Sequence, residues 1–381
     1  GASGATHPVL AEAVTQFQAL AYKELLPASG PVRTQIVGMP TPDKEAQSMR
    51  VKEFMNYQIM SEMPEYEAEF DQMLFYLPLA GSSFKKVYYD EIMQRAVSKF
   101  VPADDIGVDE SPTGIKLPYI VTVEEGTRKV LSIRRNYEAN DGMKNKINYF
   151  VHFKFLPGLG FYGFGLTHMI GGLSRTATAA LRQLLDAGTL SNLPAGFKMR
   201  GIKMRDEAQS IQPGEFRDVD APGGNLKDAF MTLPFKEPSQ TLLQLMGVVV
   251  SAGQRFASIA DLQVGDGNQQ AAVGTTVAML ERGSRVMSAI HKRMYAAMKK
   301  EFTILARLLK TYLPPVYPYD VIGGQNQIKQ MDFDDRIDIL PVADPNIFSQ
   351  TQRISLAQTE MQLAASNPQI HNQYEVYRNM Y

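Results

Sequence analysis

Aspartates cluster near the C-terminal end of the chain, and their type and spacing raise the question of metal chemistry. They are Asp332, Asp334, Asp335 and Asp338. Carboxylate oxygens are the ligands that Mg²⁺ prefers, and such ions can serve a nuclease. However, apolar residues alternate with these aspartates and Arg336 lies among them, which is typical of a strand with a polar edge. A Mg²⁺-dependent nuclease is therefore only a less favoured alternative.

Other patterns that would indicate an enzyme are missing from the sequence. The histidines are scattered and form no H-E-x-x-H pattern or His/carboxylate ligand spacing: His7, His152, His168, His291 and His371. No G-x-x-x-x-G-K-[ST] loop occurs, which excludes a motor of the P-loop kind. The glycines from Gly158 to Gly165 lack the dinucleotide spacing, so they predict a tight turn before a helix. We expect no enzymatic activity, no cofactor and no metal.

Positive charge is concentrated between Thr275 and Leu313, although the net charge of the whole chain is only -1. Glu281 and Glu301 are the acidic residues there, and the basic ones are Arg282, Arg285, Lys292, Arg293, Lys299, Lys300, Arg307 and Lys310. In a helix, the heptad spacing of Arg285, Lys292 and Lys299 places them on one face. This face is either an ordinary solvated surface or one that meets phosphate without reading base sequence.

The same segment is predicted to be a single long helix. It contains no proline, its apolar residues recur with helical spacing, and Pro314 and Pro315 end it. A helix of roughly 39 residues would be about 58 Å long. Such a rod is long for one globular core.

Composition limits the class of protein. The chain has 381 residues, of which 44% are hydrophobic, enough for a sizeable core and at least two lobes. It has no cysteine, which excludes disulfides and thiolate metal sites. The first residues, GASGATHPVL, lack the pattern of a signal peptide. The most apolar window, Leu242 to Ala252, is too short to cross a membrane, so no membrane partner is expected.

The N-terminal part is predicted to be an α+β lobe. Helices are expected over Val9–Leu26, over Asp43–Met63 with Asp43 as N-cap, and from Pro64 to about Leu77. Period-two patterns then predict strands: Phe84–Tyr89, Gln94–Val101, Tyr119–Glu124, Lys129–Arg134 and Tyr149–Phe155. Helices followed by a run of strands favour α+β over a doubly wound α/β fold.

Two further helices flank a segment rich in turns. The first is expected from Leu166 to Ala187 and the second from Gln240 to Ala260. The second helix is apolar on nearly all sides and must be covered by neighbours, which we expect to be other subunits at Leu242 and Val249.

The segment between these helices, from Ser191 to Pro238, contains basic residues at alternate positions: Lys198, Arg200, Lys203 and Arg205. On a strand, alternate residues share one face. The segment is therefore either the exposed side of a small β-unit or a surface for nucleic acid or an acidic protein.

The order of these parts resembles the portal proteins of tailed bacteriophages, the rings through which the genome enters and leaves the capsid. The resemblance depends on Pro157–Gly163, on Pro213-Gly214 and on Gly267–Thr276, in that order along the chain. It implies a portal fold with these divisions: wing 1–164, first stem helix 165–190, clip 191–238, second stem helix 239–262, tunnel loop 263–274, tunnel helix 275–313, wing return 314–345 and crown base 346–381.

The resemblance also implies a function and a set of partners. About a dozen copies would form a homo-oligomeric ring around double-stranded DNA at one capsid vertex of the virion, after assembly in the host cytoplasm. The terminase motor, a tail adaptor, the major capsid protein and scaffolding proteins would bind it. The tunnel loop would graze the DNA with Asp266, Asn268, Gln269 and Gln270, unless it is an ordinary surface loop. Another head-tail connector or adaptor ring is the main alternative.

Overall fold

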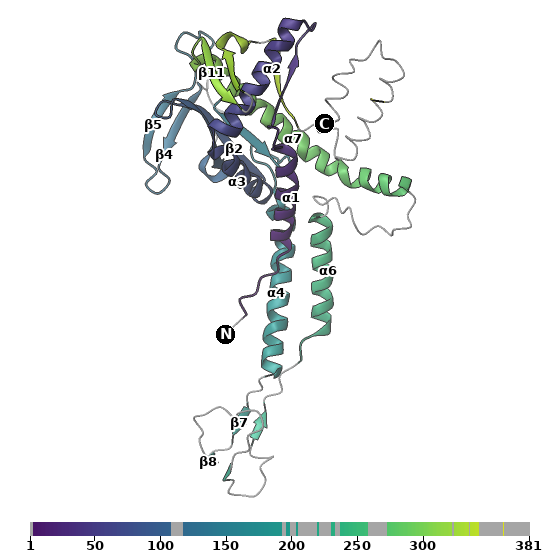
Figure 1. Ribbon diagram of the computed structural model, residues 1–381. Coiled ribbons are helices and arrows are strands. Elements are labelled where there is room, and N and C mark those ends of the chain that lie inside the picture. The colour runs from purple at the N-terminus through teal and green to yellow at the C-terminus, as the bar shows by residue number, and fades with distance from the viewer. Residues whose placement is uncertain are drawn as a thin grey trace. The chain divides into compact units, whose positions relative to one another are not determined.

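The computed structural model describes residues 3–107, 117–192, 196–198, 203–204, 219–220, 230–232, 237–257, 273–321, 324–334, 336–342 and 361. It divides into two compact units. The larger unit comprises residues 11–169 and 257–381, and the smaller comprises residues 1–10 and 170–256. Helices and strands are mixed along the chain, in agreement with the α+β class expected from the sequence (Figure 1).

The larger unit begins with helices. They are α1 (Val9–Leu25), α2 (Pro42–Tyr57) and α3 (Glu65–Ala80). The N-cap predicted at Asp43 is wrong, because the Thr41 side chain accepts a hydrogen bond from the backbone N–H of Lys44 and Pro42 opens the first turn. Proline at this position has a backbone angle suited to the first turn, and Asp43 instead meets the positive helix end. A π-turn, Gln58–Glu62, continues α2 and accounts for the predicted extension to Met63.

An antiparallel sheet in the order β3-β2-β6 forms the centre of this unit. Its strands are β2 (Ser82–Asp90), β3 (Arg95–Pro102) and β6 (Phe150–Lys154), all predicted from the sequence. One face of β2, with Ser83, Lys85 and Val87, is buried. The strands β4 (Tyr119–Val123) and β5 (Val130–Arg135) were also predicted, but among the described strands they pair with each other alone, as a separate ribbon.

Strands of the C-terminal segment lie in the larger unit, where one of them pairs with the N-terminal part of the chain. The bounds 314–345 of a wing return stay a prediction. Strand β13 (Ile337–Pro341) pairs antiparallel with β1 (Val32–Ile36), a strand that the sequence did not reveal. Strands β11 (Val316–Val321) and β12 (Gly324–Lys329) form a hairpin followed by a 3₁₀ turn over Gln330–Asp332.

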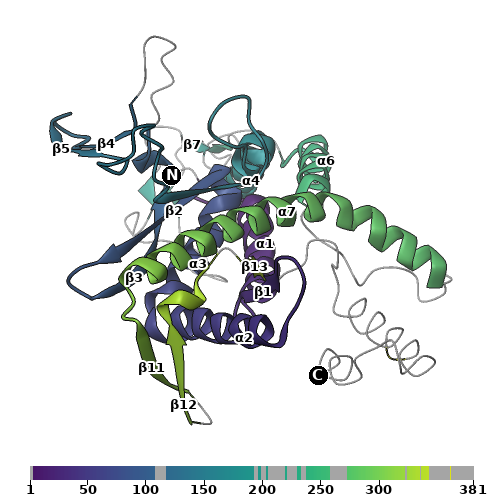
Figure 2. The same cartoon turned by 90° about the horizontal axis from the view of Figure 1, so that it is seen from above.

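The long predicted helix is α7 (Val273–Tyr312), with 40 residues. One of its faces packs into the core of the larger unit, and Figure 2 shows it running along the sheet. Its fully or almost fully buried residues include Ile290, Met294, Met298, Phe302 and Leu305. Because they recur with helical spacing, the local sequence pattern was sufficient to predict the element.

The smaller unit contains most of α4 (Leu166–Asn192), all of α6 (Gln240–Ala257) except its last residue, and short strands between them. Strand β7 (Gly196–Lys198) pairs with β10 (Phe230–Thr232), and β8 (Lys203–Met204) pairs with β9 (Val219–Asp220). The sequence-based division placed the first residues in the wing, but they line α4. The backbone N–H of His7 donates to Thr178 Oγ1 at 3.0 Å, and Arg182 Nε donates to the Ala5 carbonyl at 2.7 Å.

Candidate nucleic-acid and assembly surfaces

The described half of α7 has a buried apolar face and an exposed basic face. Lys292 and Lys310 are exposed, and the side chain of Lys299 is 40% exposed. Met294 and Met298, on the opposite side, are fully buried. Lys292 and Lys299, which the sequence predicts to share a face, therefore lie on the side of the helix away from the core. That this stripe meets phosphate stays a prediction. Arg285 belongs to the same helix, and its side chain lies outside the described residues.

Some basic residues of α7 hold the helix to the rest of its unit. Lys299 Nζ lies 2.6 Å from Asp338 Oδ2 in an ion pair. Arg293 donates to the Phe155 carbonyl at 3.0 Å, and Arg307 donates to the Asn148 carbonyl at 2.9 Å. Sequence reasoning missed these contacts because the partners are 39, 138 and 159 residues away along the chain. Lys292, Lys300 and Lys310 remain as basic side chains that face solvent.

A buried ion pair fixes which side of α7 faces the core. Lys85 Nζ lies 2.7 Å from Glu301 Oε1, and both side chains are 0% exposed. The Ser98 hydroxyl donates to the same carboxylate oxygen at 2.7 Å, and Lys85 Nζ lies 3.6 Å from the centre of the Tyr66 ring. Burial lowers the pKa of Lys85, an effect that the Glu301 carboxylate opposes. With Glu301 pointing inward, Lys292 and Lys299 must point away from the core.

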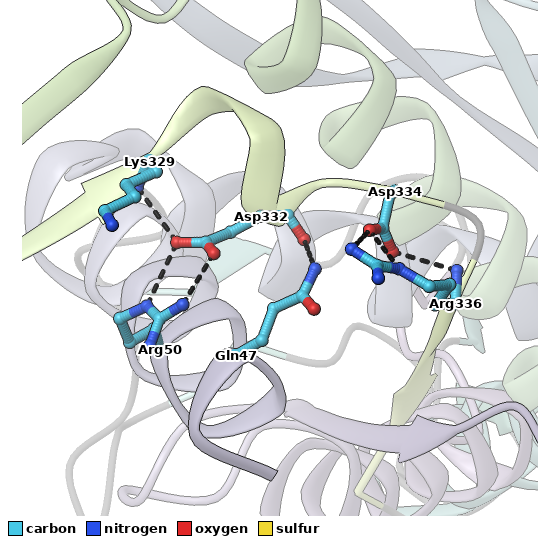
Figure 3. A network of polar contacts seen from close by, with 6 residues as sticks. All are labelled: Gln47, Arg50, Lys329, Asp332, Asp334 and Arg336. Atoms are coloured by element: carbon cyan, nitrogen blue, oxygen red, sulfur yellow. Dashed lines mark hydrogen bonds and ion pairs between the residues drawn. The ribbon is translucent and has the colours of Figure 1, made fainter. Parts of the chain in front are cut away.

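The aspartate cluster is built into ion pairs (Figure 3). Arg50 binds Asp332 through two hydrogen bonds of 2.7 and 3.0 Å, and the Lys329 backbone N–H donates to Asp332 at 3.0 Å. Asp334 accepts a hydrogen bond of 2.6 Å from Arg336 Nε.

Asp338, the remaining described member of the aspartate cluster, pairs with Lys299, and Asp335 lies outside the described residues. Each described carboxylate of the cluster thus has its own basic partner. In the part of the chain that the structure describes, no group of three or more His, Cys, Asp or Glu residues is placed to hold a metal ion.

The glycine run after Pro157 forms the tight turn that the sequence predicted. An added Cβ would lie 2.4 Å from the Leu79 carbonyl oxygen at Gly165, and 2.5 Å from the Gly81 carbonyl oxygen at Gly163. The backbone N–H of Gly163 donates to Ser82 Oγ at 2.7 Å. Only glycine permits this close approach of two backbones, so the run has a structural cause and needs no ligand.

Helix α6 presents apolar side chains that its own unit leaves uncovered. Leu242 and Val249, predicted as subunit contacts, are half-buried. More exposed are Leu243 at 53%, Leu245 at 51% and Val248 at 67%. Because the helix is apolar on nearly all sides, its sequence gave no signal for choosing among these residues. Contact with another subunit stays a prediction.

The remaining predicted contacts lie partly outside the described residues. Lys198 ends β7 and Lys203 begins β8, in agreement with a small β-unit, whereas Arg200 and Arg205 fall outside. The predicted tunnel-loop residues also fall outside: Asp266, Asn268, Gln269 and Gln270. Among the helices that the structure describes, none is both long and apolar enough for a membrane span.

No protein-family model and no curated protein sequence matches the chain. Solved structures do resemble it over most of its length. One is described as the neck of an empty GTA particle computed with C6 symmetry, with 12% identity, 98% of this chain and 90% of that chain covered, and a TM-score of 0.47. Another is the virion of a native gene transfer agent particle, with 10% identity, coverage of 96% and 88%, and a TM-score of 0.43.

A third is an HK97 family phage portal protein from Corynebacterium diphtheriae, with 14% identity, coverage of 91% and 97%, and a TM-score of 0.34. These descriptions agree with the family that the sequence resembles. Since the identities are low and the TM-scores lie below 0.5, they establish no function for this chain. The functional conclusion depends instead on its own residues.

Proposed function

We propose that this chain is a phage portal protein, a ring at one capsid vertex that conducts DNA during packaging and ejection. One observation carries the proposal: α4 and α6 flank a small β-insertion, and a 40-residue helix with an outward basic face follows them. In a monomer, a long helix with an exposed basic face has no evident structural role. A closed ring of copies would line an axis with such rods.

Electrostatics would let this ring hold DNA without binding a particular sequence. In a cyclic ring, each exposed lysine, such as Lys292, becomes a band of positive charge. Duplex DNA carries phosphate along its whole length, so these bands attract it in every register and allow it to slide. Lys299 would contribute less than its formal charge because Asp338 lies 2.6 Å away.

The other parts would serve assembly and docking. The β-insertion with Lys198 and Lys203 would receive the terminase motor during packaging and a tail adaptor afterwards. The exposed apolar side chains of α6 would be covered by a neighbouring subunit in a homo-oligomer, expected to be a dodecamer. The ring would meet scaffolding and major capsid proteins in the host cytoplasm and remain in the virion.

The alternative function, another head-tail connector or adaptor ring, is less favoured. Such a ring would not need the β-insertion between α4 and α6.

Electron microscopy of the purified protein tests the proposal. We expect ring-shaped particles with a central hole wide enough for duplex DNA, seen in negative stain and in a reconstruction without imposed symmetry. Sedimentation and mass photometry should give a matching mass. Finding only monomers or dimers at every protein concentration tested, including in buffers that reproduce the conditions of capsid assembly, would overturn the proposal.

A further inference from the structure

The β4–β5 ribbon stands apart from the rest of the larger unit. Its strands pair antiparallel, with Tyr119 opposite Arg135, Val121 opposite Ile133 and Val123 opposite Val130. Neither strand joins the β3-β2-β6 sheet, and the ribbon projects from that sheet in both views (Figures 1 and 2).

One face of the ribbon is apolar and uncovered. Its residues are roughly half exposed or more: Tyr119 46%, Val121 50%, Val123 49%, Val130 55% and Ile133 63%. Opposite residues of an antiparallel pair share a face, so the register places all of them together. A two-stranded ribbon is marginally stable in water unless its apolar face packs against something. We therefore expect this face to be buried against a partner surface.

The charge of the ribbon indicates what kind of partner fits. Arg135 lies on the apolar face, opposite Tyr119, whereas Arg134 lies on the other face, opposite Ile120. At the turn, Glu124 and Glu125 balance the charges of Arg128 and Lys129, so the surplus positive charge of the ribbon comes from Arg134 and Arg135. A complementary surface must therefore combine apolar area with negative charge.

The outer row of α3 has this combination. Glu67, Ala68, Asp71, Gln72 and Phe75 are all exposed, and their spacing places them on one side of the helix. Phe75 is 42% exposed. The Tyr22 hydroxyl donates to Glu67, and Gln18 Nε2 donates to Asp71 Oδ1 at 2.7 Å. These donors are neutral, and among the described residues no cation forms an ion pair with Glu67 or Asp71, so the row keeps its negative charge.

We propose that the apolar face of the β4–β5 ribbon docks on the outer row of α3 of a neighbouring copy of this chain. The contact joins two different patches, so it is heterologous, and such contacts generate rings when the rotation closes. Arg135 of one copy pairs with Glu67 and Asp71 of the next, and Phe75 covers the apolar ribbon. This inference rests on the proposed function, which requires the copies to associate.

Charge exchange tests this docking in the full chain. Arg135→Glu should raise the protein concentration at which half of the chains are assembled by roughly tenfold, because the new carboxylate would face Glu67 and Asp71 of the neighbouring copy. Arg134→Glu makes the same change of charge on the other face and should have a much smaller effect. Adding Glu67→Lys and Asp71→Lys to Arg135→Glu should restore assembly, as judged by mass photometry. Equal effects of R134E and R135E, or no rescue, would overturn the inference.

Disulfide trapping gives a second readout that does not depend on how the variants affect affinity. The chain contains no cysteine, so Val121→Cys and Gln72→Cys can be introduced into it singly and the two variants mixed. Oxidation should link the two variants into a covalent dimer, whereas the Gln94→Cys variant mixed with Gln72→Cys should give none. Rings without this cross-link would contradict the docking but leave the proposed function intact. Absence of any assembly in the unmodified protein would instead overturn the proposed function.

Discussion

Lys85 on β2 and Glu301 on α7 form a fully buried ion pair, 2.7 Å from Nζ to Oε1, across 216 residues of sequence. The pair joins the β3-β2-β6 sheet to the long helix. A charge in the core is stable only with a partner, since moving either ion out of water is strongly unfavourable. The pair therefore fixes the face of α7 that is turned to solvent.

Removing one member of this pair should destabilise the larger unit strongly. Lys85→Met leaves Glu301 as an uncompensated buried charge, and we expect a loss of about 3–5 kcal/mol in the free energy of unfolding. Denaturant titration at a fixed protein concentration measures it, because assembly shifts apparent stability.

The control for this prediction is the double variant Lys85→Met with Glu301→Leu. It removes both charges and should recover most of the loss, less a smaller penalty for the Ser98 hydroxyl that now lacks its acceptor. A double variant as unstable as the single one would mean that packing, rather than charge, explains the effect.

Local periodicity was sufficient to predict α7 and β6, because each has one buried face that repeats with the period of its element. Strands β2 and β3 were predicted as well, although both contain consecutive buried residues, Ser82–Lys85 and Ala96–Ser98. The pairing of Lys85 with Glu301 could not be predicted, since it depends on how a helix and a strand settle against each other. Strand β1 (Val32–Ile36) was missed for a related reason. Buried and exposed residues do not alternate regularly along β1, and its partner strand β13 lies about 300 residues away along the chain.

The two lysines of the α7 stripe should behave differently when their charge is reversed. Lys292 is exposed, so Lys292→Glu should weaken binding of duplex DNA and reduce its salt dependence without changing the melting temperature. Binding titrations of purified rings across a salt series measure both quantities. Unchanged affinity and salt slope would argue against DNA contact at this position.

Lys299→Glu should lower stability as well, because the new carboxylate would face Asp338, which is now 2.6 Å from Lys299 Nζ. The exchanged pair, Lys299→Asp with Asp338→Lys, should restore the melting temperature. Equal melting temperatures for the K299E single variant and the unmodified protein would show that the ion pair adds nothing to stability.

Gly81 should tolerate no side chain. Its φ is +84°, and an added Cβ would lie 2.3 Å from the backbone nitrogen of Gly165. Gly81→Ala should therefore cost more than about 1 kcal/mol from the backbone conformation alone, with the clash in addition. Gly160→Ala is the matched control, since nothing lies within 4 Å of its Cβ. Thermal unfolding compares the two, and similar melting temperatures would contradict the close-packing role of Gly81.

His152 should make stability depend on pH in mildly acidic solution. Its ring stacks on Phe84 at 4.3 Å between centres, and Nε2 lies 3.0 Å from Ser82 Oγ. Burial, aided by Lys154 and Lys300, lowers the pKa of His152 from 6.5 to about 4. Between these pH values the unfolded chain binds the proton and the folded chain does not. Stability is therefore complete above about pH 6.5 and decreases as the pH falls toward 4.

The variant His152→Gln tests this dependence, because glutamine can keep a hydrogen bond to Ser82 but does not titrate. Each pH unit inside the window costs at most about 1.4 kcal/mol for one proton, and less here because solvent partly screens a ring that is only half-buried. Denaturation midpoints measured from pH 7 to pH 4 should decrease less steeply in H152Q than in the unmodified protein. Parallel curves would show that another group, not His152, takes up the proton on unfolding.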